Sequence, residues 1–352
     1  MKYIIKEKIC CGKDQYTAGG KAREDVDFIA EKMKAENIKI ETPYFDKKQS
    51  IFKQIKEHYK IYKLWNDKIK DLSSCVLFIQ FPLQGNFIFV NRILKKLKKN
   101  RVKTIAIIHD LETIRAANIQ GISRKRKIRL YIQEIPALKN FSKIIVHNAK
   151  MKKYLENKGI NRNKMVNLNI FDYIIEDEIK KKSIDENNIV IAGNLSEEKS
   201  GYIYNLPSNV VFDLYGINYK DCEKENIRYH GSYPSNELPK HLNGKFGLVW
   251  DGPEADSCTG VFGEYLRWNN PHKTSLYLAC GIPVIVWKEA AIAKFIVEND
   301  LGLAVESINS ISEILDKLSE KKYQEIFSNV QKISIKLRNG YFMEKALKKA
   351  ME

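Results

Sequence analysis

Residues 265–287 read Tyr-Leu-Arg-Trp-Asn-Asn-Pro-His-Lys-Thr-Ser-Leu-Tyr-Leu-Ala-Cys-Gly-Ile-Pro-Val-Ile-Val-Trp and contain the pattern that decides the fold. Asn270 suits a helix N-cap, Pro271 a first helical residue and Gly281 the position just after a helix. A helix of about ten residues is therefore predicted between them. The apolar run 283–287 follows at once and predicts a buried strand, as in a parallel α/β sheet.

The alternation of strand and helix continues in both directions from this segment. Apolar runs predict strands at 3–9, 38–45, 75–81, 102–108 and 143–147, then at 189–192, 210–215, 227–230, 246–250, 283–287 and 301–305. A charged stretch at 173–188, poor in apolar residues, separates the two series. The pattern predicts an α/β fold with two Rossmann-like, doubly wound lobes facing a central cleft, where ligands bind at the carboxyl ends of the strands.

The two lobes give a division of the chain into domains. We expect an N-terminal, acceptor-side domain at 1–172 and a C-terminal, nucleotide-binding domain at 187–334. The tail is rich in lysine and has helical spacing of its apolar residues. A last helix at about 335–352 is expected to pack back on the first domain.

Composition limits the possible locations and partners. The chain has 352 residues and a formal charge of +17. Its longest apolar stretch, 278–287, is half of the ~20 residues needed to cross a bilayer, and its lysine-rich start has no signal-peptide core. We therefore expect a cytoplasmic protein without a transmembrane segment. The charge fits nucleic acid, an anionic membrane face or phosphorylated molecules, and also plain lysines on solvated helices.

Local clusters of basic, acidic and cysteine residues exclude some of these partners but not all of them. The densest basic cluster, Arg124–Arg129, suits a solvated face, an anionic acceptor or a peripheral membrane contact, and it lacks the interleaved aromatics of a nucleic-acid surface. No nucleic-acid partner is expected. Asp25-Val26-Asp27 has the letters of a metal-binding D-x-D, but it lies in a predicted helix, where we expect solvated surface. The six cysteines have no metal-ligand spacing, so no metal site is expected.

The start of the helix near residue 271 has the composition of an anion site. His272, Lys273, Thr274 and Ser275 would combine an ammonium, two hydroxyls and free amide groups at the positive end of the helix dipole. This set suits a diphosphate, although the Asn-Pro start and the Gly stop are also what helix caps alone require.

The segment 265–287, together with Phe246–Gly252, His109-Asp110-Leu111 and His230-Gly231-Ser232-Tyr233, resembles bacterial GT-B glycosyltransferases of the glucosyltransferase 3 and β-1,6-galactofuranosyltransferase-like group. The resemblance covers most of the chain. It implies a metal-independent transfer of a hexose, glucose favoured, from a UDP-sugar to a serine-rich surface protein that carries N-acetylglucosamine, by a homo-oligomer. The alternatives are a galactofuranosyl or other hexosyl transferase acting on a lipid-linked polysaccharide precursor, and a non-catalytic sugar-nucleotide-binding subunit.

The resemblance also assigns donor-binding residues. Lys273, with Asn270, His272, Thr274 and Ser275, would contact the diphosphate, and the lysine would stabilise the departing UDP, so that neither a metal nor a cofactor is needed. Asn194 would lie at the nucleotide, unless Gly193-Asn194 is a simple turn, and Tyr215 either stacks on uracil or belongs to the core. The loop with Thr17, Gly20 and Lys21 either contacts phosphate or sugar, or is a simple turn.

Acidic and imidazole groups near strand ends are candidates for the chemistry. His109 or Asp110 would be the general base of an inverting transfer, or else His109 packs in the core and Asp110 caps the next segment. Asp251, with Glu254 and Asp256, would bind sugar hydroxyls.

Overall fold

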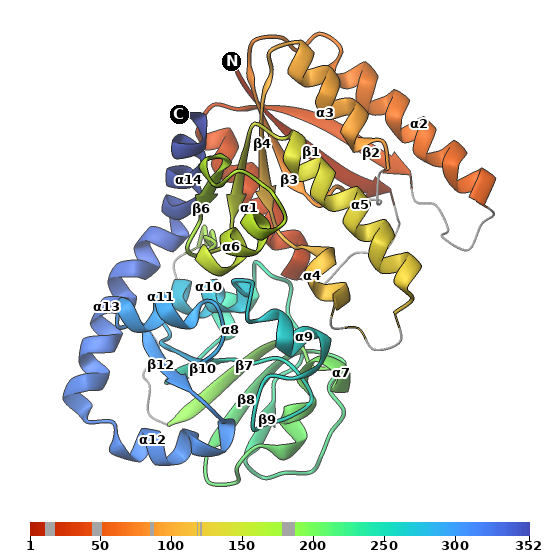
Figure 1. Ribbon diagram of the computed structural model, residues 1–352. Coiled ribbons are helices and arrows are strands. Elements are labelled where there is room, and N and C mark those ends of the chain that lie inside the picture. Colours follow the sequence, from red (N-terminus) through yellow and green to blue (C-terminus); the bar gives the residue numbers. More distant parts are fainter. Residues whose placement is uncertain (11–17, 44–50, 85–87, 118, 120–121, 178–186) are drawn as a thin grey trace.

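The computed structural model describes the chain except residues 11–17, 44–50, 85–87, 118, 120–121 and 178–186. It contains two six-stranded sheets, one in each lobe, and every strand pairing is parallel. Figure 1 shows the two lobes stacked one above the other. The predicted α/β class with two doubly wound lobes is confirmed.

The N-terminal sheet has the strand order β2-β1-β3-β4-β5-β6. Its strands are β1 (Lys2–Cys10), β2 (Glu36–Pro43), β3 (Val76–Phe81), β4 (Lys103–Ile108), β5 (Lys143–Val146) and β6 (Met165–Asn167). Its helices are α1 (Ala18–Lys32), α2 (Ile51–Ile69), α3 (Val90–Lys99), α4 (Glu112–Ala117), α5 (Arg124–Asn140) and α6 (Ala149–Asn157). One core lies between this sheet and helices α2, α3 and α5, and a second core lies under α1 on the other face.

The C-terminal sheet has the strand order β12-β11-β10-β7-β8-β9. Its strands are β7 (Asn188–Asn194), β8 (Val211–Ile217), β9 (Ile227–Tyr229), β10 (Phe246–Val249), β11 (Val284–Trp287) and β12 (Gly302–Val305). Its helices are α7 (Glu197–Ser200), α8 (Leu238–His241), α9 (Gly260–Tyr265), α10 (His272–Ala279), α11 (Ala293–Glu298), α12 (Ile311–Lys317) and α13 (Glu320–Arg338). Its core joins both halves of the sheet to α10 and α13.

The last helix, α14 (Tyr341–Met351), lies against the N-terminal lobe. Figure 1 shows α13 rising along the lower lobe and α14 continuing beside the upper one. Gly340 between them has φ 77°, and a Cβ there would come within 2.6 Å of Ile29 Cγ1, so this close turn requires glycine. Met343 and Leu347 then enter the core under α1. This arrangement ties the two lobes together.

Two local details differ from the sequence-based expectation. Helix α1 begins at Ala18, so Gly20 lies within its first turn and not in a separate loop before it. Helix α10 begins at His272, with Pro271 at the N-cap position and Cys280 at its end, while Gly281 follows with φ 78° as the stop requires. Among the described residues, every helix is too short or too polar to cross a membrane.

Candidate functional site

The carboxyl ends of β4 and β5 meet the segment 265–275 of the C-terminal lobe. Tyr265 reaches across, where its hydroxyl accepts a hydrogen bond from Leu111 N at 2.8 Å and contacts the Asp110 carboxylate. Lys150 on α6 donates to the backbone oxygen of Glu289 at 3.0 Å. Polar contacts of Tyr265 and Lys150 therefore contribute to the junction between the lobes.

Asn270 is the centre of this junction. Its side-chain nitrogen donates to His147 O and to Asn169 O, both at 2.8 Å, and its oxygen accepts from Asn148 Nδ2 at 2.8 Å. Its backbone N–H donates to His147 Nδ1 at 3.0 Å. The Asn270 amide is thus fully used between the lobes and does not cap α10. Its predicted contact with the donor diphosphate stays a prediction.

His147 at the end of β5 is the partner that makes this contact possible. Its Nε2 lies 3.0 Å from Ile108 O, which can only accept, so the ring proton is on Nε2 and Nδ1 is free to accept from Asn270. Burial lowers the pKa of His147 to about 4, so the ring stays neutral.

His272 and Ser275 face the same junction. Ser275 Oγ donates to Phe171 O at 2.7 Å, and the His272 ring lies 5.0 Å from the Tyr173 ring and bonds the backbone of Asp172. Burial lowers the pKa of His272 to about 4, and its Nε2 is buried without a hydrogen-bond partner. Successive helical residues point about 100° apart, so His272, Lys273 and Ser275 have different protein partners. Their role in binding the donor stays a prediction.

Lys273 points into its own lobe. Its Nζ donates to Asp251 Oδ1 at 2.8 Å and to Trp250 O at 2.9 Å, and the two charged side chains are 12% and 9% exposed. Asp251, which follows β10, is therefore paired with Lys273 of α10. The sequence analysis did not predict this ion pair. Beside it, Thr274 Oγ1 is buried without a hydrogen-bond partner, and no side chain caps the start of α10.

The nucleotide candidates lie at the ends of β7 and β8. The strands approach so closely that a Cβ on Gly216 would lie 1.7 Å from Gly193 O. Asn194 follows, half-buried, and its Oδ1 accepts from Ser196 N at 3.1 Å and from Asn218 Nδ2 at 2.9 Å. The backbone at Gly193 is thus exposed at the strand end, with Asn194 beside it.

Tyr215 is a core side chain. It is 5% exposed, its ring stacks on His230 at 4.7 Å, and its hydroxyl donates to His241 O. Of the two alternatives for Tyr215, the core position is the one observed. His230, whose side chain is 38% exposed, is held by Asp213 Oδ1 at 2.7 Å and covers the face of Tyr215.

Glu254 and Asp256, which were named with Asp251 as candidates for binding sugar hydroxyls, take no part in the ion pair of Asp251 with Lys273. Glu254 is exposed, and Asp256 Oδ1 accepts from Asn309 Nδ2 at 2.8 Å on the surface.

Of the candidate residues at the start of α1, Lys21 makes structural contacts. Lys21 Nζ binds Asp25 and donates to Ile174 O at 2.8 Å, and it lies 5.1 Å from the Tyr173 ring centre. Lys21 thus attaches α1 to the segment between the lobes. Gly20 is exposed, and Thr17 lies outside the described residues.

The expected solvated Asp25-Val26-Asp27 surface is wrong. Asp25 and Asp27 are 3% and 6% exposed. Their partners lie on other elements: Ile174 N donates to Asp25, and Gln80 Nε2 donates to Asp27. Burial raises the pKa of Asp25 to about 6 and that of Asp27 to about 7.

His109 at the end of β4 is held by a buried relay. Its Nε2 lies 2.7 Å from Gln80 Oε1, and Gln80 Nε2 donates to Asp27 Oδ1 at 2.7 Å and to Arg23 O at 3.2 Å. Because a backbone carbonyl can only accept, Gln80 must present its oxygen to His109. The His109 ring proton therefore sits on Nε2, and Nδ1 keeps its lone pair. Burial holds the pKa of His109 well below its usual range.

Asp110, the next residue, is half open. Its carboxylate is 41% exposed and lies 3.7 Å from Arg115 Nη1. The surrounding protein raises its pKa, and Arg115 opposes this shift. A neutral imidazole and a carboxylate thus stand side by side at the carboxyl end of β4, where either can accept a proton.

Gln80, His147 and Tyr265 were not recognised in the sequence as site residues. Gln80 could have been found, because it is the single polar residue in the apolar run 75–81 and a buried polar group needs a hydrogen-bond partner. No sequence pattern indicates His147 or Tyr265, since their partners lie far away in the chain.

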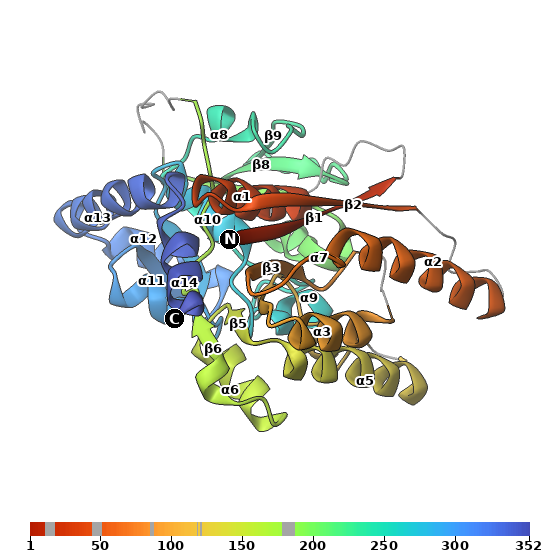
Figure 2. The same cartoon turned by 90° about the horizontal axis from the view of Figure 1, so that it is seen from above.

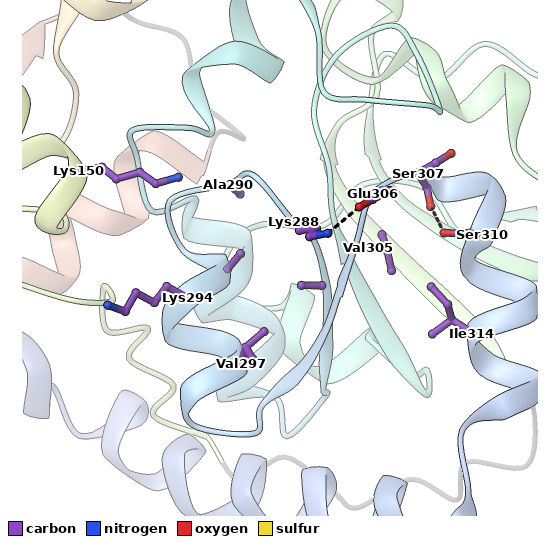
Figure 3. A pocket seen from close by; sticks show the side chains of 12 residues that line it. Lys150, Lys288, Ala290, Lys294, Val297, Val305, Glu306, Ser307, Ser310 and Ile314 are labelled. Carbon is purple, nitrogen blue, oxygen red and sulfur yellow. Dashed lines mark hydrogen bonds and ion pairs between the residues drawn. The ribbon is translucent and has the colours of Figure 1, made fainter.

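The described part of the chain also contains an open hollow of about 700 Å³ at the carboxyl ends of β11 and β12. Figure 3 shows Lys150, Lys288 and Lys294 around it, with Lys288 bonded to Glu306. None of the predicted donor-binding residues lines it. Among the described residues, no group of three or more His, Cys, Asp and Glu side chains could hold a metal ion. The side chains of 125–129 in the basic cluster are outside the described set.

Comparison with known proteins gives consistent matches. Two family models cover nearly the whole chain: the glucosyltransferase 3-like N-terminal domain at residues 1–170 and the glucosyltransferase 3-like C-terminal domain at 189–350. The β-1,6-galactofuranosyltransferase WbbI of Escherichia coli (strain K12) is 35% identical over 281 residues, 79% of each chain. Glucosyltransferase 3 of Streptococcus gordonii is 27% identical, over 77% of this chain and 78% of the relative.

Solved structures agree on the fold. The sucrose-phosphate synthase of Thermosynechococcus elongatus superimposes with a TM-score of 0.65 at 10% identity and covers 99% of this chain and 98% of its own. This structure and that of the lipopolysaccharide outer core galactosyltransferase WaaB share the GT-B arrangement of two facing lobes with the present chain. The protein is a GT-B glycosyltransferase, and its chain belongs to the glucosyltransferase 3-like family.

Proposed function

We propose that this protein transfers a hexose from a UDP-sugar to a hydroxyl of a sugar-bearing acceptor, without a metal ion or cofactor. The single observation that carries the proposal is the start of α10, where Lys273 and the uncapped first turn of the helix lie at the carboxyl end of β10. A helix start of this kind attracts phosphate through its free amides and its dipole.

Lys273 retains the capacity to bind a phosphate while it is paired with Asp251. An ammonium group has three N–H donors, and two are used by Asp251 and Trp250 O. The third is left for an oxygen of the diphosphate. Thr274 Oγ1, buried without a partner, supplies a further donor. As the bond to the sugar breaks, charge develops on the departing UDP, and the lysine stabilises it more than it stabilises the bound donor.

The other half of the reaction is assigned to the N-terminal lobe. In an inverting transfer, His109 Nδ1 accepts the proton of the attacking acceptor hydroxyl, since Gln80 holds the ring with its proton on Nε2. Asp110 is the alternative proton acceptor.

The choice of sugar has two candidates. Glucose and an acceptor protein bearing N-acetylglucosamine follow from the resemblance to glucosyltransferase 3. The other candidate is galactofuranose, transferred to a lipid-linked glycan. It is supported by the identity to WbbI, which at 35% is higher than the 27% identity to glucosyltransferase 3. A cytoplasmic location and a homo-oligomeric state belong to the proposal in either case.

The purified protein should be incubated with UDP-glucose, UDP-galactopyranose, UDP-galactofuranose and UDP-N-acetylglucosamine. Each donor is paired with a serine-rich peptide carrying N-acetylglucosamine and with a polyprenyl-diphosphate-linked N-acetylglucosamine. We expect mass spectrometry to detect addition of one hexose to one acceptor. No transfer and no hydrolysis of any UDP-sugar, with turnover of a GDP- or TDP-sugar, would refute the proposal.

A further inference from the structure

The first half of helix α2 exposes apolar side chains. Phe52, Ile55 and Tyr59 are 87%, 47% and 46% exposed, and their spacing of three and four residues puts them on one face of the helix. The residues Ile61 and Trp65 are both 1% exposed and pack in the core beneath the helix. Helix α2 thus has one apolar face in the core and a second apolar stripe directed outward.

Positive charge surrounds this stripe. Helix α2 has five lysines against Glu57 and Asp67, and Lys53, Lys56 and Lys63 are exposed beside the apolar residues. Lys63 Nζ lies 5.2 Å from the centre of the Tyr59 ring. The combination of exposed apolar groups and lysine is typical of a helix that lies at a membrane surface.

The neighbouring helix α3 extends the charged surface. Its sequence, Val-Asn-Arg-Ile-Leu-Lys-Lys-Leu-Lys-Lys, has five basic residues and no acidic residue. Lys96 Nζ donates to Asn66 Oδ1 at 2.6 Å and so joins the two helices, while Arg92, Lys95 and Lys99 are exposed. Figures 1 and 2 show α2 and α3 side by side at the outer edge of the N-terminal lobe, with α2 reaching beyond the rest of the molecule.

We propose that the α2–α3 surface, formed by the exposed residues of these two helices, docks on an anionic lipid bilayer. Phe52, Ile55 and Tyr59 would enter the region between headgroups and acyl chains, and the lysines would bind acidic headgroups. A second copy of this chain is disfavoured because two lysine-rich faces would repel each other. Nucleic acid fits the charge but gives no role to the aliphatic Ile55, since bases stack on aromatic rings.

The surface accounts for part of the +17 charge, and it is independent of the donor and acceptor proposed above. It would hold the N-terminal lobe at the bilayer.

The test is co-sedimentation of the full-length protein with vesicles of phosphatidylcholine alone and of phosphatidylcholine mixed with phosphatidylglycerol. We expect binding to the mixed vesicles only, weakened by salt. The triple variant Phe52→Ser, Ile55→Ser, Tyr59→Ser should bind at least about tenfold more weakly. The matched control Val297→Ser, Ile335→Ser removes residues that are 53% and 63% exposed outside the α2–α3 surface and should bind as the wild type does.

The proposal is overturned if the wild type ignores anionic vesicles or if the triple variant binds them equally well. It is also overturned if the triple variant keeps vesicle binding but loses self-association or binding to single-stranded DNA, because the surface would then serve a second copy or a nucleic acid. All variants should still unfold in one cooperative transition, since Phe52 is 87% exposed and Ile55 and Tyr59 are nearly half exposed.

Discussion

His109 Nε2 and Gln80 Oε1 lie 2.7 Å apart, and the direction of this hydrogen bond is fixed because the other end of the Gln80 amide donates to the carbonyl of Arg23. A glutamine on β3 thus selects the tautomer of the histidine that directly follows β4. Neighbouring parallel strands bring the two residues together although 29 positions separate them in the chain.

The variant Gln80→Met should lower kcat about a hundredfold, because loss of the oriented imidazole removes the benefit of general base catalysis. Imidazole nitrogen shifts in NMR should report loss of the fixed Nε2–H tautomer of His109. The matched control is Gln331→Met on α13, whose amide also donates to a carbonyl, that of Gly281. Unchanged kcat in the Gln80 variant, with the His109 tautomer disturbed, would show that His109 is not the base.

Glu7 on β1 should make stability depend on pH. Burial raises its pKa from 4.5 to about 7, and its Oε1 has no partner. Between these values the unfolded chain has lost the proton that the folded chain keeps, so stability falls as pH rises, by at most about 1.4 kcal/mol per pH unit.

The variant Glu7→Gln has no carboxyl that titrates at this position. Its stability relative to the wild type should therefore rise as pH rises from 4.5 to 7 and stay constant above pH 7. Urea unfolding across this range measures the effect. Glu306→Gln is the control, because Lys288 lowers the pKa of this exposed carboxyl and no such gain should occur. A constant difference between Glu7→Gln and wild type at all pH values would contradict the assignment.

Asn270→Ala should destabilise the protein by about 1 to 2 kcal/mol, because it removes three hydrogen bonds at the lobe junction, two donated to His147 O and Asn169 O and one accepted from Asn148 Nδ2. The neighbouring Asn269→Ala is the control, since Asn269 Oδ1 is already without a partner. Urea unfolding should therefore separate the two variants. Equal losses would mean that the lobe junction does not depend on Asn270.

Transfer should continue in EDTA at the rate measured without it, because Lys273 and the start of α10 neutralise the diphosphate in our proposal. Turnover is measured after dialysis against the chelator. Loss of activity that manganese restores would require a metal site in place of this arrangement.

Most strands of the two sheets could be located from the sequence, because buried parallel strands are continuous apolar runs. The three-residue β6 and the six-residue α4 were too short for a periodic signal. Residues 270–275 are adjacent in the chain and looked like one ligand set. The helical rotation turns Lys273 toward Asp251 and Ser275 toward Phe171.

The missing part of the site is made of long-range partners. His147, Asn148 and Gln80 contact groups that are 29 to 123 positions away, and local patterns contain no information on such pairs. Asp27 was expected on the surface for the same reason, since only the packing of α1 against β3 brings Gln80 to it.

The most direct test of the account is isothermal calorimetry of UDP with the paired variant Lys273→Met, Asp251→Asn, which removes the lysine without leaving a buried charge unpaired. The control is Lys288→Met, Glu306→Gln, an exposed ion pair after the next strand. We expect the Kd for UDP to rise at least about tenfold in the first variant and to stay unchanged in the control. Unchanged UDP affinity in the folded Lys273 variant would contradict a diphosphate site at the start of α10.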